Sequence, residues 1–118
     1  MPDKKHLNKQ KGHAGESLAE GFLLQQGYRI LSRNFRFRRA EVDLIATDGE
    51  ELVIVEVKLR KSNRFGFPEE DVSNRKVELL YEAGYAFREQ QQLSIPVRFD
   101  IIAISLDESD IRHFKNAF

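Results

Sequence analysis

Two runs of β-forming residues, one on each side of an Asp-Gly pair, constrain the fold of this chain more than any other feature. The runs cover residues 40–46 and 51–60, and Thr47-Asp48-Gly49-Glu50 separates them. β-branched residues favour extended backbone, and an Asp-Gly pair between two such runs is a strong signal for a hairpin turn. The sequence therefore predicts two neighbouring antiparallel strands.

The segments on either side of this hairpin predict two helices and more strands. Helical apolar spacing covers residues 14–26, where Gly27 is a good C-terminal stop, and residues 72–91. Three more segments have the alternation or the β-branched content of strands, and they cover 28–35, 97–106 and 111–118. The core order α-β-β-β-α-β predicts an α/β domain with a mixed central sheet flanked by helices.

Length and composition bound the class of protein. A chain of 118 residues with 41% hydrophobic and 32% charged residues is typical of one soluble domain with its own apolar core. Cysteine is absent, which excludes disulfide scaffolds and thiolate chemistry. The apolar runs are far too short to cross a bilayer, and residues 1–6 lack an apolar signal core. We expect a cytoplasmic domain over 13–118 with no membrane partner, preceded by a flexible basic arm over 1–12 that carries Lys4, Lys5, Lys9 and Lys11.

Positive and negative charges balance in total but are unevenly distributed. The chain holds 19 basic and 19 acidic residues, which argues against a protein that simply coats nucleic acid. Residues 1–40 nevertheless carry a net charge of +6, and residues 41–60 carry −4. An ordinary solvated surface explains this asymmetry as well as a functional one does.

Two carboxylates of the predicted hairpin lie near each other. Strand alternation places Glu41, Asp43 and Ile45 on one face of the first strand, and Ile54, Glu56 and Lys58 on one face of the second. A two-residue loop makes Asp43 and Glu56 diagonal neighbours, and a four-residue loop over 48–51 makes them direct partners. A three-residue loop separates them unless a bulge intervenes.

Such a pair of carboxylates favours a bound cation. Like charges that face each other across two strands repel, and a divalent metal between them removes that repulsion. Oxygen ligands without nearby His or Cys suit Mg²⁺ or Mn²⁺. Lys58 could orient an attacking water or stabilise negative charge on a phosphate, and the backbone oxygen of Val57 could be a further ligand. An Asp followed by Glu-x-Lys is, on its own, a loose pattern.

Several motifs in the same order resemble the YraN-like family of uncharacterised bacterial proteins. They are Gly15-Glu16 with Ala19, residues 27–31, 33–36, 41–45 and 55–58, Phe65-Gly66, Val72, Lys76 and residues 98–100. The resemblance covers about residues 12–104. That family is similar to the PD-(D/E)xK nuclease superfamily, especially to archaeal Holliday-junction resolvases. The resemblance therefore implies a restriction-endonuclease-like core.

The resemblance also assigns roles to individual residues. It implies Asp43 and Glu56 as metal ligands and Lys58 as the catalytic lysine, with Glu16 completing the site from the first helix. An exposed acid stabilised by the helix dipole is the alternative explanation of Glu16. Glu41 matches the family pattern and is a further candidate ligand. The chain departs from that pattern at Ala40, where the family generally has glycine.

Six basic residues are candidates for binding nucleic-acid phosphates. They are Arg33, Arg36, Arg38, Arg39, Arg75 and Lys76. Phe35 and Phe37 are interleaved with the first four, where they could stack on bases or pack in the core. Asp100, inside an apolar strand, suggests a structural partner such as Arg98 or a polar group of the first helix, because burying an unpaired charge is costly.

These patterns predict a Mg²⁺- or Mn²⁺-dependent endonuclease-like hydrolase that acts on DNA. The resemblance implies branched or otherwise structured DNA as substrate, and a homodimer as the working form. Two other classes fit the residues: a non-catalytic nucleic-acid-binding module with the same fold, and a small protein-interaction adaptor whose charged hairpin contacts its partner.

Overall fold

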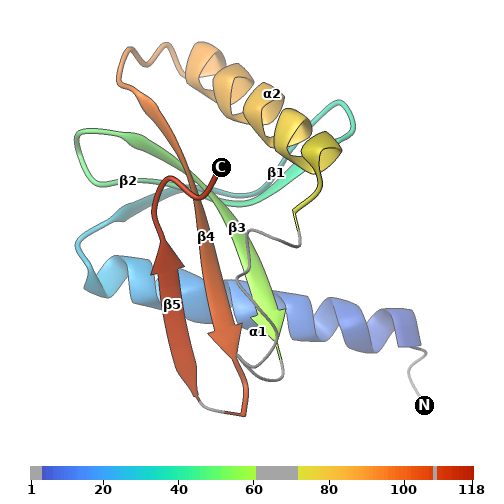
Figure 1. Ribbon diagram of the computed structural model, residues 1–118. Coiled ribbons are helices and arrows are strands. Elements are labelled where there is room, and N and C mark those ends of the chain that lie inside the picture. Colours follow the sequence, from blue (N-terminus) through green and yellow to red (C-terminus); the bar gives the residue numbers. More distant parts are fainter. Residues whose placement is uncertain (1–3, 61–71, 108) are drawn as a thin grey trace.

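The described part of the chain forms a five-stranded sheet with one helix on each face (Figure 1). The computed structural model describes residues 4–60, 72–107 and 109–118, and the side chains from residue 14 onward within those ranges. The elements follow in the order α1 (Lys4–Gln25), β1 (Arg29–Phe37), β2 (Ala40–Thr47), β3 (Leu52–Arg60), α2 (Asn74–Gln90), β4 (Val97–Ser105) and β5 (Asp110–Phe114).

The sheet has the mixed topology that the sequence predicts. Strand order is β1-β2-β3-β4-β5, and β3 pairs with β4 in parallel while the other neighbours are antiparallel. α2 forms the crossover between the two parallel strands. The predicted order α-β-β-β-α-β is confirmed, and β5 adds the last strand at the edge.

Several elements begin or end elsewhere than the sequence predicts, and β5 ends at Phe114 instead of residue 118. α1 begins at Lys4, ten residues before the predicted start, because lysine, glutamine and leucine in this segment are good helix formers. The division into an arm over 1–12 and a domain over 13–118 stays a prediction. β1 continues to Phe37, which leaves Arg38 and Arg39 as the two-residue turn into β2.

The turn between β2 and β3 is stabilised by its own side chains. Thr47 pairs with Leu52, so the loop has four residues, 48–51, as in one of the two same-face alternatives. Asp48 Oδ1 accepts hydrogen bonds from the backbone N–H groups of Glu50 (2.9 Å) and Glu51 (2.8 Å). Gly49 has a φ of 97°, which glycine adopts without steric cost.

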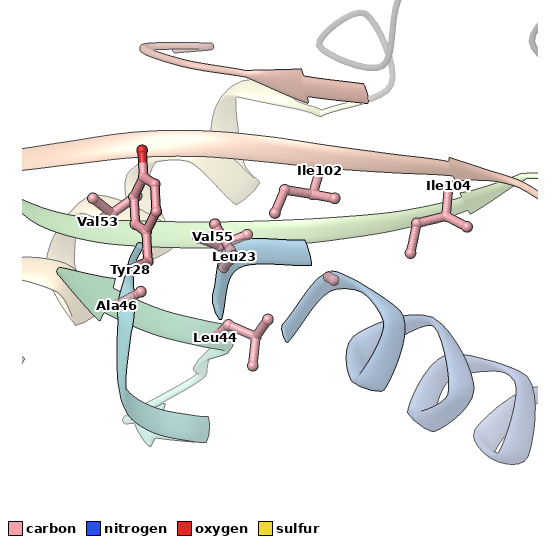
Figure 2. Packing of buried hydrophobic residues seen from close by; sticks show 9 residues of the cluster. Leu23, Tyr28, Leu44, Ala46, Val53, Val55, Ile102 and Ile104 are labelled. Atoms are coloured by element: carbon pink, nitrogen blue, oxygen red, sulfur yellow. The ribbon is translucent and has the colours of Figure 1, made fainter. Parts of the chain in front are cut away.

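The core consists of one apolar cluster on each face of the sheet. The cluster under α1, drawn in Figure 2, holds Ala19, Leu23, Tyr28, Leu44, Ala46, Val53, Val55, Ile102 and Ile104. The cluster under α2 holds Ala40, Val42, Ile45, Leu52, Ile54, Leu80, Ala83, Phe87 and Phe99. Alternate residues of β3 therefore face opposite helices, as expected for a strand buried on both sides.

β2 does not keep that alternation along its whole length. Val42 and Ile45 both pack on the side of α2, while Leu44 packs on the side of α1. Opposite this irregularity β1 contains Asn34, whose φ of 51° lies in the left-handed region. The regular alternation predicted for β2 therefore fails at Asp43, the residue between Val42 and Leu44.

Among the described residues no helix has both the length and the apolar character that a bilayer crossing requires.

Candidate metal centre

The sheet forks where β2 and β3 separate. Their ladder runs from the pair Thr47 and Leu52 to the pair Leu44 and Val55. Beyond it, β2 continues beside β1, and β3 continues beside β4, so that the two halves diverge (Figure 1). Asp43 and Glu56 are the next two positions in the same register, and they lie at the fork.

The side chain of Asp43 replaces a backbone partner at this point. Its Oδ2 accepts a hydrogen bond of 2.8 Å from the backbone N–H of Val57. The N–H and C=O groups of one strand residue point to the same side of the strand, so the carbonyl of Val57 also faces the fork. Two carboxylates and one backbone oxygen thus border the same gap between strands.

Charged residues on both helices shift the pKa of Asp43. Burial and the negative charge of Glu56 raise the pKa of Asp43 to about 7, against the opposing effect of the Val57 hydrogen bond. Glu16 of α1 raises this pKa further, and Lys76 of α2 lowers it. The repulsion between Asp43 and Glu56 that the sequence predicts is therefore present.

Glu56 is a buried carboxylate with an incomplete set of partners. The residue is 5% exposed. Its Oε1 lies 3.6 Å from Nζ of Lys58 and 3.4 Å from Nζ of Lys76. Its Oε2 is buried and has no hydrogen-bond partner among the described residues. An unsatisfied buried acceptor costs about 1–3 kcal/mol, more for a charged one, so this oxygen is suited to a cation.

These donors fit a hard divalent cation. Mg²⁺ is commonly held by one or two carboxylates, with water completing its shell. Asp43, Glu56 and the carbonyl of Val57 meet that requirement. Within the part of the chain that the structure describes, no three His, Cys, Asp or Glu side chains gather closely enough to hold a metal. The described side chains thus support a site with two carboxylates.

The other two candidate acids lie apart from this pair. Glu16 is half-buried on α1. The preceding residue, Gly15, packs close to β3, because a Cβ added to Gly15 would lie 3.5 Å from Leu59 Cδ1. Glu16 acts on Asp43 through its charge. Glu41 is exposed on β2 and forms an ion pair of 3.4 Å with Arg36. Neither gathers with two other described carboxylates into a group that could hold a metal.

The six basic candidates divide among three places. Lys76 lies at the fork with Glu56, and its neighbour Arg75 pairs with Glu78 on the surface of α2 at 3.4 Å. Arg33 forms a two-point ion pair with Glu20 of α1, with 2.9 Å between Nε and Oε2.

The last three candidates lie at the end of the β1–β2 hairpin, and they are Arg36, Arg38 and Arg39. Arg38 has a φ of 56°, which is rare for a residue with a side chain, and its guanidinium lies 5.1 Å from the centre of the Phe37 ring. The ring of Phe35 packs edge-on against Phe87 at 5.2 Å. Phe35 and Phe37 both pack against the cluster under α2, so a core role fits them better than base stacking.

A buried ion network in the first half of β4 has a structural role. Asp100 is fully buried and Arg98 is its partner, with 2.9 Å between Arg98 Nη2 and Asp100 Oδ2. His113 Nε2 lies 2.7 Å from the same oxygen, and Tyr28 Oη lies 2.7 Å from Arg98 Nη2. Burial opposes ionisation, yet the bonds from His113 and Arg98 hold the pKa of Asp100 below its usual value.

Sequence reasoning identified Arg98 as the partner of Asp100 and missed His113 and Tyr28. His113 lies in β5 and Tyr28 in the connection between α1 and β1, and local spacing carries no signal for such long-range contacts.

A pocket of about 560 Å³ lies away from the carboxylates, between β1 and the end of α2. Its lining includes Leu31, Phe35, Phe87, Leu93 and Ile95, with Arg29, Ser32, Thr47, Gly49 and Gln91. None of the candidate metal ligands lines it. The chemistry of the fork therefore does not depend on this pocket.

Comparison with known proteins gives a consistent result along the sequence. The uncharacterised protein family UPF0102 matches residues 15–104. A UPF0102 protein of Clostridioides difficile (strain 630) is 40% identical over 112 residues, which cover 94% of this chain and 98% of that protein. One from Thermodesulfovibrio yellowstonii is 44% identical over 107 residues, which cover 91% of this chain and 94% of that protein.

Among solved structures, the chain is similar to SfsA of Pyrococcus furiosus in complex with Ca²⁺. The two share 16% sequence identity with a TM-score of 0.33. The match covers 92% of this chain and 63% of SfsA, so this chain spans less than two thirds of that protein.

Proposed function

The chain belongs to the uncharacterised protein family UPF0102, the YraN-like family that its motifs resemble, and on that premise we propose that it is a Mg²⁺- or Mn²⁺-dependent nuclease that hydrolyses phosphodiesters of DNA. One observation carries the proposal. Glu56 is buried beside Asp43 at the fork, and its Oε2 has no hydrogen-bond partner among the residues that the structure describes. A chain with no use for a cation gains nothing from this arrangement.

Three groups would hold the metal: the carboxylates of Asp43 and Glu56 and the backbone oxygen of Val57. When bound, Mg²⁺ supplies a Lewis acid that polarises a phosphoryl oxygen. The chain's own contribution is to fix these oxygens on rigid strands. Asp43 is held by the N–H of Val57 at 2.8 Å, and Glu56 lies on β3 where that strand pairs with Ile101 of β4.

Lys58 would act on the phosphate. It follows Glu56 on the same face of β3, and its Nζ lies 3.6 Å from Glu56 Oε1. An ammonium at this place stabilises negative charge that develops on the phosphoryl oxygens, and it orients the attacking water. Lys58 is thus the catalytic residue, and its loss should lower cleavage while DNA binding is retained.

Exposed basic residues of the β1–β2 hairpin and of α2 support an anionic substrate. Arg38 and Arg39 are exposed at the turn of the β1–β2 hairpin, and Arg36 is exposed beside them. Arg75 adds a further charge in the first turn of α2. Such residues bind phosphates without reading bases. DNA with branches is the first substrate to test, and a homodimer is part of the proposal.

A cleavage assay tests the proposed function. Linear, flap and four-way-junction DNA are incubated with the protein in Mg²⁺, Mn²⁺ or EDTA. We expect metal-dependent cleavage, lowered about 10²–10³-fold in Lys58→Ala, as for other groups that stabilise transition-state charge. Lys115→Ala, an exposed lysine beyond the edge strand β5, is the matched control and retains activity.

The same assay distinguishes the two other classes of function. DNA binding without cleavage in either metal would favour a non-catalytic module. Neither binding nor cleavage would favour an adaptor. Cleavage that is equal in Lys58→Ala and the wild type would overturn the proposed role of the fork.

A further inference from the structure

Two lysines from different elements converge on one oxygen of Glu56. Lys58 comes from β3 and Lys76 from α2, and their ammonium groups lie 3.6 Å and 3.4 Å from Oε1. With the neighbouring Asp43, the fork holds two carboxylates and two ammonium groups, so a divalent cation would give it an excess of positive charge. The motif Glu-x-Lys accounts for Lys58 and leaves Lys76 without a role.

The place of Lys76 is unfavourable for a cation in the absence of Glu56. α2 begins after Ser73, whose Oγ accepts a hydrogen bond of 3.1 Å from the backbone N–H of Lys76. Lys76 therefore lies in the first helical turn, where the helix dipole disfavours positive charge. Arg75 adds a second positive charge in that turn. The carboxylate of Glu56 is what offsets this repulsion for Lys76.

Resting on the proposed metal site, we propose that Lys76 is a positioning residue that competes with the divalent cation for Glu56. Without the cation, its ammonium balances the buried carboxylate. When the cation binds, the ammonium faces a positive site at the positive end of α2, and its side chain moves to solvent. The Lys76 side chain is 41% exposed, so this movement displaces no core residue.

Lys58 is not the lysine that leaves. Its side chain is 27% exposed and projects from β3 at a position that is paired with Ala103 of β4. Lys76 is the more exposed of the two and the one opposed by a helix dipole. Its release frees a charge beside the fork without altering the strand that carries Glu56.

Titration with Mn²⁺ alone, followed by the electron paramagnetic resonance signal of the free ion, tests the inference. Removing the competing charge in Lys76→Met should tighten Mn²⁺ binding about tenfold relative to the wild type. Lys76→Arg, which keeps the charge, should bind as the wild type does. Arg75→Met removes the same charge one residue away, from an arginine that pairs with Glu78. It should change the Mn²⁺ affinity less than about twofold.

A second readout separates competition from a merely structural role. In metal-free buffer, Lys76→Met should melt at a lower temperature than the wild type, and Mn²⁺ should raise its melting temperature by more. If Lys76 only supported the fold, Lys76→Met would lower both the stability of the protein and its Mn²⁺ affinity. Should Lys76→Met not fold, Lys76→Gln removes the same charge and gives the same comparison.

Each outcome of the titration has one meaning. If the wild type binds Mn²⁺ and Lys76→Met binds it equally or more weakly, the competition is overturned and the metal site remains in place. Binding by Lys76→Met alone supports the competition in its strongest form. Binding by neither protein overturns both the competition and the metal site on which the proposed function rests.

Discussion

Asp43 has two tasks at the fork of the sheet. Its Oδ2 accepts the N–H of Val57, as a ladder carbonyl would, and the same carboxylate would be a metal ligand. Burial and the charge of Glu56 raise its pKa to about 7, so near neutral pH it exists in both protonation states. The titration of one residue thus bears on the stability of the metal-free protein.

Asp43→Asn should remove a pH dependence of stability. Folded Asp43 binds its proton more tightly than unfolded Asp43, whose pKa is about 4. The stability that it contributes is therefore full below about pH 4 and is lost as the pH rises through about 7. Urea unfolding in EDTA should show the wild type losing stability relative to Asp43→Asn over this window, by at most about 1.4 kcal/mol per pH unit. A difference that is constant with pH would contradict the assignment.

Arg98→Met should be strongly destabilising. It leaves the fully buried Asp100 without its arginine partner, and breaking a buried ion pair costs about 3–5 kcal/mol. Arg112→Met is the matched control, because Arg112 pairs with Asp110 at the surface at the same 2.9 Å and such pairs contribute about 0–1 kcal/mol. Urea unfolding measures both. Equal destabilisation would show that Arg98 and Asp100 are not the structural pair inferred from their burial.

At the scale of elements, the position of α2 decides the geometry of the fork. Its glycine at position 84 lies so close to the sheet that a Cβ there would be 2.9 Å from Ile54 Cγ1 and 2.9 Å from Phe99 Cε1. Ile54 precedes Glu56 by two residues on the same face of β3. The close approach of α2 therefore sets where Lys76 meets Glu56.

Gly84→Ala should destabilise the protein although alanine is the better helix former. The added methyl group overlaps two core side chains, and overpacking costs about 1–3 kcal/mol, against a gain in helix propensity of about 1 kcal/mol. Gly21→Ala in α1 is the control. An added Cβ there meets nothing within 4 Å, so this variant should be stabilised by up to about 1 kcal/mol. Thermal unfolding gives the two signs, and a stabilised Gly84→Ala would show that α2 does not pack as described.

The elements also show where sequence reasoning succeeds and where it stops. The β2–β3 hairpin was predictable because its turn is held by local contacts, with Asp48 accepting from Glu50 and Glu51. The irregularity at Asp43 was not, because it depends on a hydrogen bond from Val57, fourteen residues away. The meeting of Lys76 with Glu56 likewise depends on how α2 packs, which spacing along the chain does not encode.

At the scale of the whole molecule, the zero net charge combines a basic N-terminal third with an acidic β2–β3 hairpin. Arg33 is engaged by Glu20, so part of the basic N-terminal third is neutralised within the fold. Arg38 and Arg39, at the turn of the β1–β2 hairpin, remain exposed on the surface. A cation on Asp43 and Glu56 would reverse the local negative charge, which makes the fork compatible with DNA despite an acidic hairpin.

Replacing Arg38 and Arg39 together by alanine should weaken DNA binding without regard to sequence. Removing one phosphate-binding side chain should make the slope of log affinity against log salt shallower by about 0.9 on duplex DNA, so the double variant should be shallower by up to about 1.8. Fluorescence anisotropy with Ca²⁺ in place of Mg²⁺ measures this slope. An unchanged slope would place the DNA elsewhere on the protein.

The most direct test of the central claim is a crystal structure of the protein soaked in Mn²⁺, with anomalous differences measured above the manganese edge. Our account predicts a peak in the fork of the sheet, within bonding distance of carboxylate oxygens of both Asp43 and Glu56. A well-ordered fork without a peak at saturating Mn²⁺, or with Mn²⁺ bound only at other surfaces, would contradict it.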